Sequence, residues 1–466
     1  MSMKKDVELK NFFIFNSLYG PKEGEELKKI LYYYPITDNA DVQIKNVGLV
    51  EGIIQFTGTF KPSTPVNSLH TQKMRQLYFQ PEKNMWIVMT LTLPTEVKGK
   101  DSSNQIEYLE DDVQDNVYEA VLKQAYYTYR LFWDTFEHTV ENHDVGTLKT
   151  RLENFYKAYL KTLKLGHADI LNVFHGIQYL PLDKLTFLKV QCFINSLECE
   201  YPEIEYTAFL YNDHLIWSGF EPKDMKIVYQ YLIGTLLPAN MEAELQGGSM
   251  PRNSASPFAA LHHGRFITGP TNLKTAKSVG KIPKVYLFAS GKAESYNLVV
   301  YRALSASICL FMKADKELSL QYFKDMDGFI SPKLTAVVSD ISEYCSKQVI
   351  TPSNVPENAP RFIYFNKLNL AYKSTAHLDN KQTGNIACTK ESLKIMADLN
   401  NKKSLLGHSS ETIVKTMNDY WVVAKNSNSR EFYVALQQKN ASLIDISEEI
   451  KKLCDTELKG IFFHPL

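Results

Sequence analysis

Residues 206–220 read YTAFLYNDHLIWSGF, and this stretch predicts a β-hairpin. Aromatic and branched residues fill both of its halves, and Asn212-Asp213 between them tolerates the positive φ of a tight turn. A helix is expected directly afterwards, because Pro222 suits a first helical turn and apolar residues recur every three or four positions up to Pro238. The stretch therefore predicts an α/β unit in which a helix follows a hairpin.

The same layout occurs twice more in the chain, at residues 412–425 and, more loosely, at residues 77–93. Each second strand carries a tryptophan within three residues of its start: Trp86, Trp217 and Trp421. A single tryptophan in a strand is an ordinary core residue. Three equivalent placements indicate three related α/β units.

Length and composition agree with this organisation. The 466 residues exceed one hydrophobic core, and at about 150 residues per domain they predict three domains. The chain has 52 basic and 52 acidic residues and no net charge, so no nucleic-acid partner and no charge-driven membrane binding is indicated. With no apolar signal core and no run of about 18 apolar residues, the sequence favours a cytosolic protein.

We expect α/β (α+β) domains over residues 10–165, 166–350 and 360–466, each with a central, mostly antiparallel sheet flanked by helices. A Gly/Ser/Pro/Asn-rich loop over 239–282 interrupts the second domain, and we expect it to be dispensable for folding. Residues 351–360 contain three prolines and are the best linker candidate.

Several elements of the second domain are specified by the sequence pattern. A strand is expected over 170–174, and a helix over 318–345 that breaks near Pro332. A helix over 184–199 carries two apolar rows that both look buried. One row is Leu185, Leu188, Cys192 and Cys199, and the other is Phe187, Val190, Ile194 and Leu197.

The expected helix over 41–60, with Asp41 as a plausible N-cap, has an unusual composition. Apolar residues fill about half of its circumference, which is wider than the stripe of an ordinary surface helix. The opposite half carries Gly48, Gly52 and Gly58. Because glycine costs an exposed helix about 1 kcal/mol relative to alanine, these glycines indicate close approach of another backbone. The alternative is a solvated face of poor helix propensity.

No motif for covalent catalysis or metal binding is present. Residues 269–275 resemble a phosphate-binding loop but lack the glycine before the lysine, and His262-His263 has no acidic or cysteine partner at ligand spacing. The six cysteines lack CxxC or Cys/His spacing, so we expect small buried hydrophobes. The cluster His70, Gln72, Lys73 and Arg75 is either a solvated strand face or a protein contact. We expect no metal, no cofactor and no covalent chemistry.

Several stretches closely resemble the animal Ccz (calcium-caffeine-zinc sensitivity) family. They are KNVGL at 45–49, SLHTQK at 68–73, YTAFLYND at 206–213, LIWSG at 215–219, FIYFN at 362–366, IVKTMNDYWVV at 413–423 and IFF at 461–463. The resemblance spans essentially the whole chain. It implies three longin domains and a subunit of the Mon/Ccz guanine nucleotide exchange factor for the Rab GTPase of late endosomes, lysosomes and vacuoles.

The resemblance also implies partners and a location. The obligate partner would be the Mon subunit, joined in animals by a third, propeller-containing subunit. The complex would lie peripherally on endosomal, lysosomal and autophagosomal membranes and promote endosome maturation, autophagy and fusion with the lysosome or vacuole. The alternative is a longin scaffold that recruits tether or coat proteins without accelerating nucleotide release.

In this family the first longin domains of the two subunits pair and form the exchange site. The resemblance therefore places the Mon interface on the helix over 41–60, at Gly48, Gly52, Ile53 and Phe56. The residues expected to face the GTPase are polar or half-exposed groups beside that helix. They are Tyr34, Pro35, Gln55, Thr59, His70, Gln72, Lys73 and Arg75.

Overall fold

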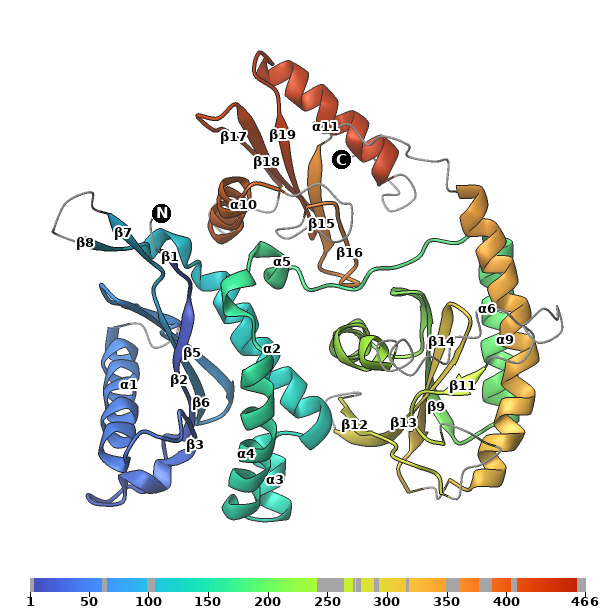
Figure 1. The fold of residues 1–466 in the computed structure, drawn as a ribbon, viewed down its shortest axis with the longest axis horizontal. Helices are drawn as coiled ribbons and strands as arrows, with labels where there is room; N and C mark the ends of the chain where they lie inside the picture. The colour runs from blue at the N-terminus through green and yellow to red at the C-terminus, as the bar shows by residue number, and fades with distance from the viewer. Residues whose placement is uncertain are drawn as a thin grey trace. The chain divides into compact units, whose positions relative to one another are not determined.

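The computed structural model divides the chain into two compact units, Met1–Phe174 with His377–Gly407, and His175–Ala376 with His408–Leu466. Figure 1 shows the elements of both units. The structure describes residues 4–60, 65–98, 105–240, 264–270, 273, 278–288, 293–315, 318–348, 360–376, 388–403 and 409–458.

Three sheets, each built on five strands in the same order, form the cores of the domains. The first sheet contains β2 (Glu8–Asn16), β3 (Ile30–Tyr34), β4 (Ser68–His70), β5 (Met74–Glu82) and β6 (Met85–Thr92). The second contains β9 (Ile204–Tyr211), β10 (His214–Ser218), β11 (Arg265–Phe266), β13 (Glu294–Ala303) and β14 (Ala306–Lys313), with β12 (Lys284–Leu287) also paired to β13. The third contains β15 (Arg361–Asn366), β16 (Tyr372–Ser374), β17 (Ser410–Lys415), β18 (Tyr420–Ser427) and β19 (Arg430–Gln437).

The order of strands is the same in all three sheets. Within each sheet, with the five strands numbered along the chain, the spatial order is second, first, fifth, fourth, third. All of these strand pairs are antiparallel. The repeated topology confirms the predicted fold class of mixed α/β domains with antiparallel sheets.

The predicted hairpin turns also form. Asn84, Asn212 and Asp419 have φ of 62°, 50° and 60°, which is the left-handed backbone conformation that Asn and Asp tolerate. Trp86 and Trp421 are buried in their sheets, at 6% and 7% exposure. The turn chemistry is thus confirmed, but Trp217 is only half-buried. The expected equivalence of the three tryptophans is wrong, because β6, β10 and β18 are the fifth, second and fourth strands of their sheets.

Helices cover both faces of the first sheet. On one face, α1 (Ala40–Phe60) covers a core that includes Phe13, Tyr33 and Val88. On the other face, α2 (Asp115–Trp133) and α4 (Val145–Thr162) cover a larger core that includes Tyr129 and Tyr156. The short elements of this unit are β1 (Lys4–Lys5), β7 (Thr95–Lys98), β8 (Gln105–Tyr108), α3 (Phe136–Asn142) and α5 (Ile170–Val173).

In the second sheet, α6 (Lys184–Glu200) and α9 (Leu320–Gln348) lie side by side on one face (Figure 1). The helix α7 (Pro222–Tyr231) follows the hairpin of β9 and β10, as predicted, with Pro222 in its first turn. In the third sheet, α11 (Leu443–Glu457) buries Ile446 and Ile450 against the strands.

Four local expectations are wrong. Residues 170–173 form the helical turn α5, because Asp169 and Asn172 close a capping box that favours helix over strand. Helix α9 runs through Pro332, held there by the buried Ile330 and Leu334. The exposed loop that the Lys/Ser/Asn-rich sequence predicts over residues 95–105 is wrong at its ends, where residues 95–98 and 105–108 pair as β7 and β8. Asn39, rather than Asp41, caps α1, since its Oδ1 accepts from the backbone amide of Val42 at 2.9 Å.

The expected burial of cysteines and of α6 is also wrong in part. Cys309 and Cys388 are buried, Cys345 and Cys454 are half-buried, and Cys192 and Cys199 are exposed. The two exposed thiols lie on the α6 row that begins at Leu185, and that row faces solvent, whereas the second row is packed into the core. The spacing of apolar residues shows which faces of a helix are apolar. It does not show whether other parts of the same chain pack on each of those faces.

Some expectations lie outside the described residues. These are residues 241–263 of the long loop, including His262-His263, all of the linker 351–360 except Pro360, and the IFF stretch at 461–463. The part of 239–282 that is described includes β11, which pairs with β13.

Candidate partner-binding surface

Helix α1 is attached to the first sheet by a narrow inner row. Only Val47 and Val50 are fully buried, at 3% and 0% exposure. Two polar contacts fix its position: Lys29 Nζ lies 2.6 Å from a carboxylate oxygen of Glu51, and the Asn46 amide donates to the Tyr33 hydroxyl at 2.6 Å. Ile54 is half-buried against the same core, and the side of the helix that faces away from the sheet is exposed.

The opposite side of α1 is exposed and largely apolar. We define the α1 outer face as Gly48, Leu49, Gly52, Gln55, Phe56, Thr59 and Phe60, all exposed. Leu49, Phe56 and Phe60 are 58%, 65% and 74% exposed, and the two phenylalanine rings contact each other edge to face with centroids 4.9 Å apart. Large apolar side chains gathered in this way on a soluble surface mark an interaction site.

The glycines of this face have open space around them. A Cβ built on Gly48 or Gly52 meets no atom within 4 Å. Neither glycine is therefore needed for packing against the described part of this chain. Their absence of side chains leaves room for a neighbour to approach the helix backbone.

The cluster at His70 and Arg75, unlike the α1 outer face, is held by ion pairs and hydrogen bonds within the chain. Arg75 is only 5% exposed, and its Nη1 lies 2.6 Å from Oδ1 of Asp115. Oδ2 of Asp115 also accepts from Ser68 at 2.6 Å and contacts His70 Nε2 at 2.8 Å. Burial would raise the pKa of the Asp115 carboxyl, but these hydrogen bonds and the Arg75 charge outweigh it and lower the pKa. Arg75 thus ties β5 to the start of α2, and His70 is engaged with it.

The remaining residues expected to face the GTPase fall at separate places. Gln72 and Lys73 are exposed on the turn between β4 and β5, and Lys73 Nζ lies 6.0 Å from the ring centroid of Tyr108. Tyr34 and Pro35 are half-buried before the N-terminus of α1.

Gln55 lies fifteen residues beyond Ala40, where α1 begins. At 1.5 Å per residue this puts Gln55 about 22 Å from the Tyr34-Pro35 end of the helix. The structure therefore brings Gln55 and Thr59 together on the α1 outer face but does not gather all eight residues into one patch.

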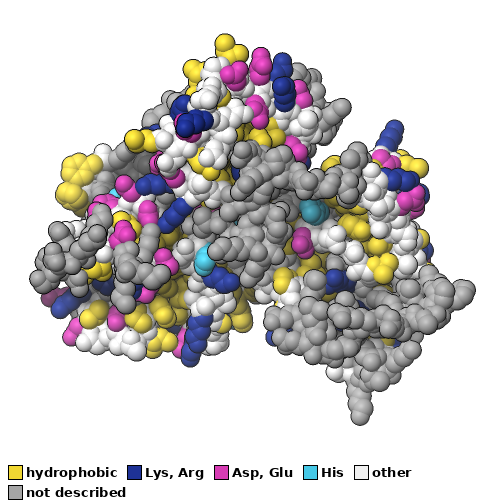
Figure 2. Space-filling model, turned by 45° about the horizontal axis from the view of Figure 1, so that its top comes forward, with side chains coloured by type: hydrophobic (Ala, Val, Ile, Leu, Met, Phe, Trp, Pro, Cys, Tyr) yellow, Lys and Arg dark blue, Asp and Glu magenta, His cyan; other side chains and the backbone are white. Residues whose placement is uncertain are grey.

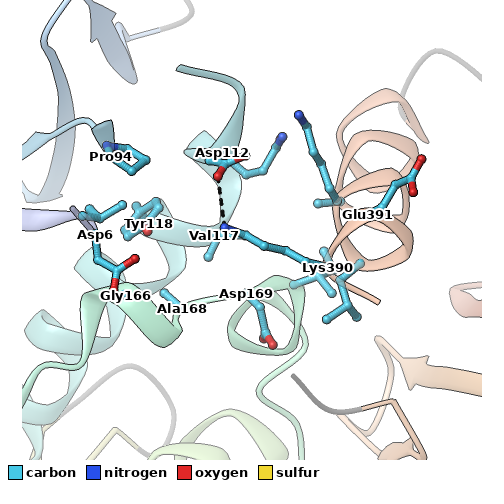
Figure 3. A pocket seen from close by; sticks show the side chains of 16 residues that line it. Asp6, Pro94, Asp112, Val117, Tyr118, Gly166, Ala168, Asp169, Lys390 and Glu391 are labelled. Atoms are coloured by element: carbon cyan, nitrogen blue, oxygen red, sulfur yellow. Dashed lines mark hydrogen bonds and ion pairs between the residues drawn. The ribbon is translucent and has the colours of Figure 1, made fainter. Parts of the chain in front are cut away.

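Sequence reasoning missed a cavity in the first unit, of about 380 Å³, whose wall includes α10 (Lys390–Lys402) (Figure 3). Lys390 Nζ contacts Asp112 at 3.1 Å, and Lys394 Nζ lies 3.8 Å from Asp111. Burial raises the pKa of the Asp169 carboxyl at the cavity wall to about 6. None of the expected site residues lines this cavity.

The sequence contained a signal for this contact. Lys390 and Lys394 are one helical turn apart, and an acidic run over 107–112 precedes α2. The order of residues along the chain assigned α10 to the third domain, whereas its packing places it in the first unit.

Among the described residues, no group of His, Cys, Asp and Glu side chains is arranged to hold a metal ion, and no helix is long and apolar enough to cross a membrane. On the face drawn in Figure 2, the Lys and Arg side chains are interspersed with Asp and Glu over the described surface. The α1 outer face itself contains no Asp, Glu, Lys or Arg, so apolar exposure rather than charge defines it.

Three family models cover most of the chain. The model for the first longin domain of INTU, CCZ1 and HPS4 matches residues 9–134. The models for the Intu longin-like domains 2 and 3 match residues 204–331 and 357–453. Together with the repeated sheet topology, these matches define a protein of three longin-like domains.

Curated relatives extend the similarity over the full length. The chain is 47% identical over 459 residues to a vacuolar fusion protein CCZ1 homolog of Xenopus laevis, covering 98% of this chain and 97% of the relative. The homolog of Nematostella vectensis is 44% identical over 467 residues, covering 99% of both. The homolog of Dictyostelium discoideum is 29% identical, covering 98% of both. The chain belongs to the CCZ1 homolog family.

Proposed function

We propose that this chain is a subunit of a heteromeric guanine nucleotide exchange factor that activates the Rab GTPase of late endosomes and lysosomes. The full-length similarity to vacuolar fusion proteins is the observation that carries the proposal. The activity would promote endosome maturation and the fusion of endosomes and autophagosomes with the lysosome or vacuole. The complex would act peripherally on those membranes.

The α1 outer face supports a longin partner, which we take to be the Mon subunit. Leu49, Phe56 and Phe60 expose apolar surface that a monomer gains nothing by exposing. Gly48 and Gly52 offer a bare helix backbone with open space above it. In this assignment Gly48, Gly52, Ile53 and Phe56 contact the Mon subunit, while a third, propeller-containing subunit binds elsewhere on the complex.

Nucleotide exchange requires no covalent chemistry from this chain. The factor must bind the nucleotide-free GTPase more tightly than the nucleotide-bound form, and linkage then requires that it weaken nucleotide binding equally. Such a function is carried by surfaces. Gln55 and Thr59 on the α1 outer face and Gln72 and Lys73 on the β4–β5 turn are the exposed groups that we assign to GTPase contact.

The proposal is tested by measuring release of a fluorescent GDP analogue from purified Rab GTPases. The chain and the Mon subunit are added together and separately, at matched concentration. We expect faster release from the late-endosomal Rab only with the two together. Release that stays at the intrinsic rate, despite a stable complex, would support the scaffold alternative and overturn the exchange function.

A further inference from the structure

One short extended segment of the chain pairs with two different longin domains. Residues 175–180 begin the second compact unit, ahead of α6, and lie outside the strands of its two sheets. Ile177 forms a parallel bridge with Ala371, directly before β16 in the third domain. Tyr179 forms a parallel bridge with Leu215 of β10 in the second domain. We call residues 175–180 the bridging segment.

Backbone hydrogen bonds join the bridging segment to the third domain. The Ile177 amide donates to the Leu370 carbonyl at 2.8 Å, and the Tyr372 amide donates to the Ile177 carbonyl at 2.9 Å. Leu370 has a φ of 57°, in the left-handed region that a leucine adopts only where the surrounding structure imposes it. The Ile177 side chain has no exposed surface. The turn between β15 and β16 is therefore shaped to receive this segment.

A second pair of backbone hydrogen bonds joins the bridging segment to the second domain. The Leu215 amide donates to the Gln178 carbonyl at 2.8 Å, and the Leu180 amide donates to the Leu215 carbonyl at 3.0 Å. The Leu180 side chain packs against the core of the second domain, and Gln230 of α7 donates to the His175 carbonyl at 3.4 Å. The segment thus covers part of the open edge of β10, which is an end strand of the second sheet.

Gly176 allows the bridging segment to lie close to the third domain. A Cβ at this position would lie 2.5 Å from the Tyr372 Cβ, 2.6 Å from the Leu370 carbonyl oxygen and 3.2 Å from a ring carbon of Phe365. The first two of these atoms are fixed by the backbone, so no change of rotamer relieves the overlap. Any side chain at position 176 must therefore displace the β15–β16 turn from the segment.

We propose that the bridging segment makes the second and third longin domains one rigid body that unfolds cooperatively, and that this coupling depends on Gly176. Domains joined only by a stretch of chain move and unfold independently. Here the segment adds two backbone hydrogen bonds on each side, so the domains part only when one pair breaks. A partner that binds either domain then stabilises both. The inference is independent of the exchange function, because every contact lies within this chain.

The tryptophans of the chain give each domain its own signal for a test. Trp217 lies in the second domain and Trp421 in the third, while Trp86 and Trp133 lie in the first. The full chain is labelled with fluorinated tryptophan, and its native fluorine NMR resonances are followed through urea unfolding. Single Trp→Phe variants assign the resonances. In the wild type we expect the Trp217 and Trp421 resonances to disappear at the same urea concentration.

A matched pair of substitutions tests the role of Gly176. Gly176→Ala adds only the Cβ, and the Trp421 resonance should then disappear at a lower urea concentration than the Trp217 resonance. Gly328→Ala, at an exposed position of α9 where a Cβ meets no atom within 4 Å, is the control and should keep the two transitions together. Native resonances without urea show that each variant folds. Separate transitions in the wild type, or a shared transition in Gly176→Ala, would overturn the proposal.

A second measurement tests the coupling without a change in the bridging segment. Alanine favours a helix over glycine, so Gly328→Ala stabilises α9 of the second domain. In a coupled body this substitution raises the urea midpoints of Trp217 and Trp421 by the same increment. In the Gly176→Ala background it should raise the Trp217 midpoint alone. A rise confined to Trp217 in the otherwise wild-type chain would overturn the proposal.

Amide hydrogen exchange reports on the contact itself. Gly176→Ala should speed exchange of the Ile177 and Tyr372 amides by more than about tenfold, because their hydrogen bonds open when the β15–β16 turn is displaced. The Leu180 and Leu215 amides are the internal control and should stay protected, since the overlap lies on the side of the third domain. Unchanged exchange at Ile177 and Tyr372 would show that Gly176 does not control the contact and would overturn the proposal.

Discussion

The guanidinium Nη1 of Arg75 lies 2.6 Å from Oδ1 of Asp115, and the Arg75 side chain is 6% exposed. This contact joins β5 to the first turn of α2 across one end of the first sheet. A residue that looks like an exposed basic contact in the sequence is therefore part of the folded core, and only its neighbours on the β4–β5 turn remain available to a partner.

The first prediction concerns the stability that this contact provides. Arg75→Gln should lower the free energy of unfolding by roughly 2–4 kcal/mol, because it leaves the Asp115 charge without its buried partner. Lys73→Gln, two residues away and exposed, is the control and should change stability by less than about 0.5 kcal/mol. Thermal or urea unfolding monitored by circular dichroism measures both. Equal stability of the two variants would contradict the structural role of Arg75.

The lowered pKa of Asp115 adds a pH dependence. A carboxyl whose pKa is lower in the folded state stabilises the fold above its unfolded pKa of about 3.9, and that contribution is lost as the pH falls through the folded value. The wild-type chain should therefore lose stability below about pH 4. Asp115→Asn should lack this component of the acid-induced loss, measured as the unfolding midpoint in urea at several pH values.

The second prediction concerns Asp169, whose pKa is raised to about 6 by burial. In this case the folded state binds a proton more readily than the unfolded state, so the group destabilises the fold at pH 7 and that penalty fades as the pH falls from about 6 to about 4. Asp169→Asn retains an N-cap for α5 and carries no charge.

The Asp169→Asn variant should be more stable than the wild type at pH 7, by on the order of 1–2 kcal/mol, and should approach it near pH 4. Urea unfolding at both pH values measures this difference. A variant that is less stable at pH 7 would show that the charged carboxylate is favourable in the fold. Asp183→Asn, which changes the N-cap of α6, is the matched control for the capping effect itself.

The third prediction separates assembly from folding at the α1 outer face. Gly52→Leu introduces a side chain into open space, and leucine favours a helix over glycine by up to about 1 kcal/mol. The chain alone should therefore keep or gain stability, whereas the Mon subunit should no longer co-purify with it. If the Mon subunit still co-purified at wild-type stoichiometry, Gly52 would not be part of the interface.

The fourth prediction concerns GTPase contact at the β4–β5 turn. Lys73→Glu reverses an exposed charge and should slow GDP release from the late-endosomal Rab while the Mon subunit remains bound. Lys83→Glu, on the turn between β5 and β6, is a matched reversal at another turn of the same sheet and should leave release unchanged. If the Lys73→Glu complex released GDP at the wild-type rate, the β4–β5 turn would not contact the GTPase.

The sequence by itself determined the local elements and their repetition. The turn dipeptides at Asn212 and Asp419 and the helix expected over 41–60 are specified by neighbours along the chain, where φ preference and periodicity act directly. The resemblance to the Ccz family rested on the same short stretches, and the full-length relatives confirmed it.

Only the tertiary structure decided which faces are covered and which charges are paired. Arg75 and Asp115 are forty residues apart, so no periodicity connects them. The α6 row at Leu185 and the inner row at Val190 look alike in sequence, yet only the inner row is buried. Likewise, α10 follows β16 in the chain but packs in the first unit, beside α2. Burial is a property of what lies opposite a side chain in space, and a local pattern carries no information about that neighbour.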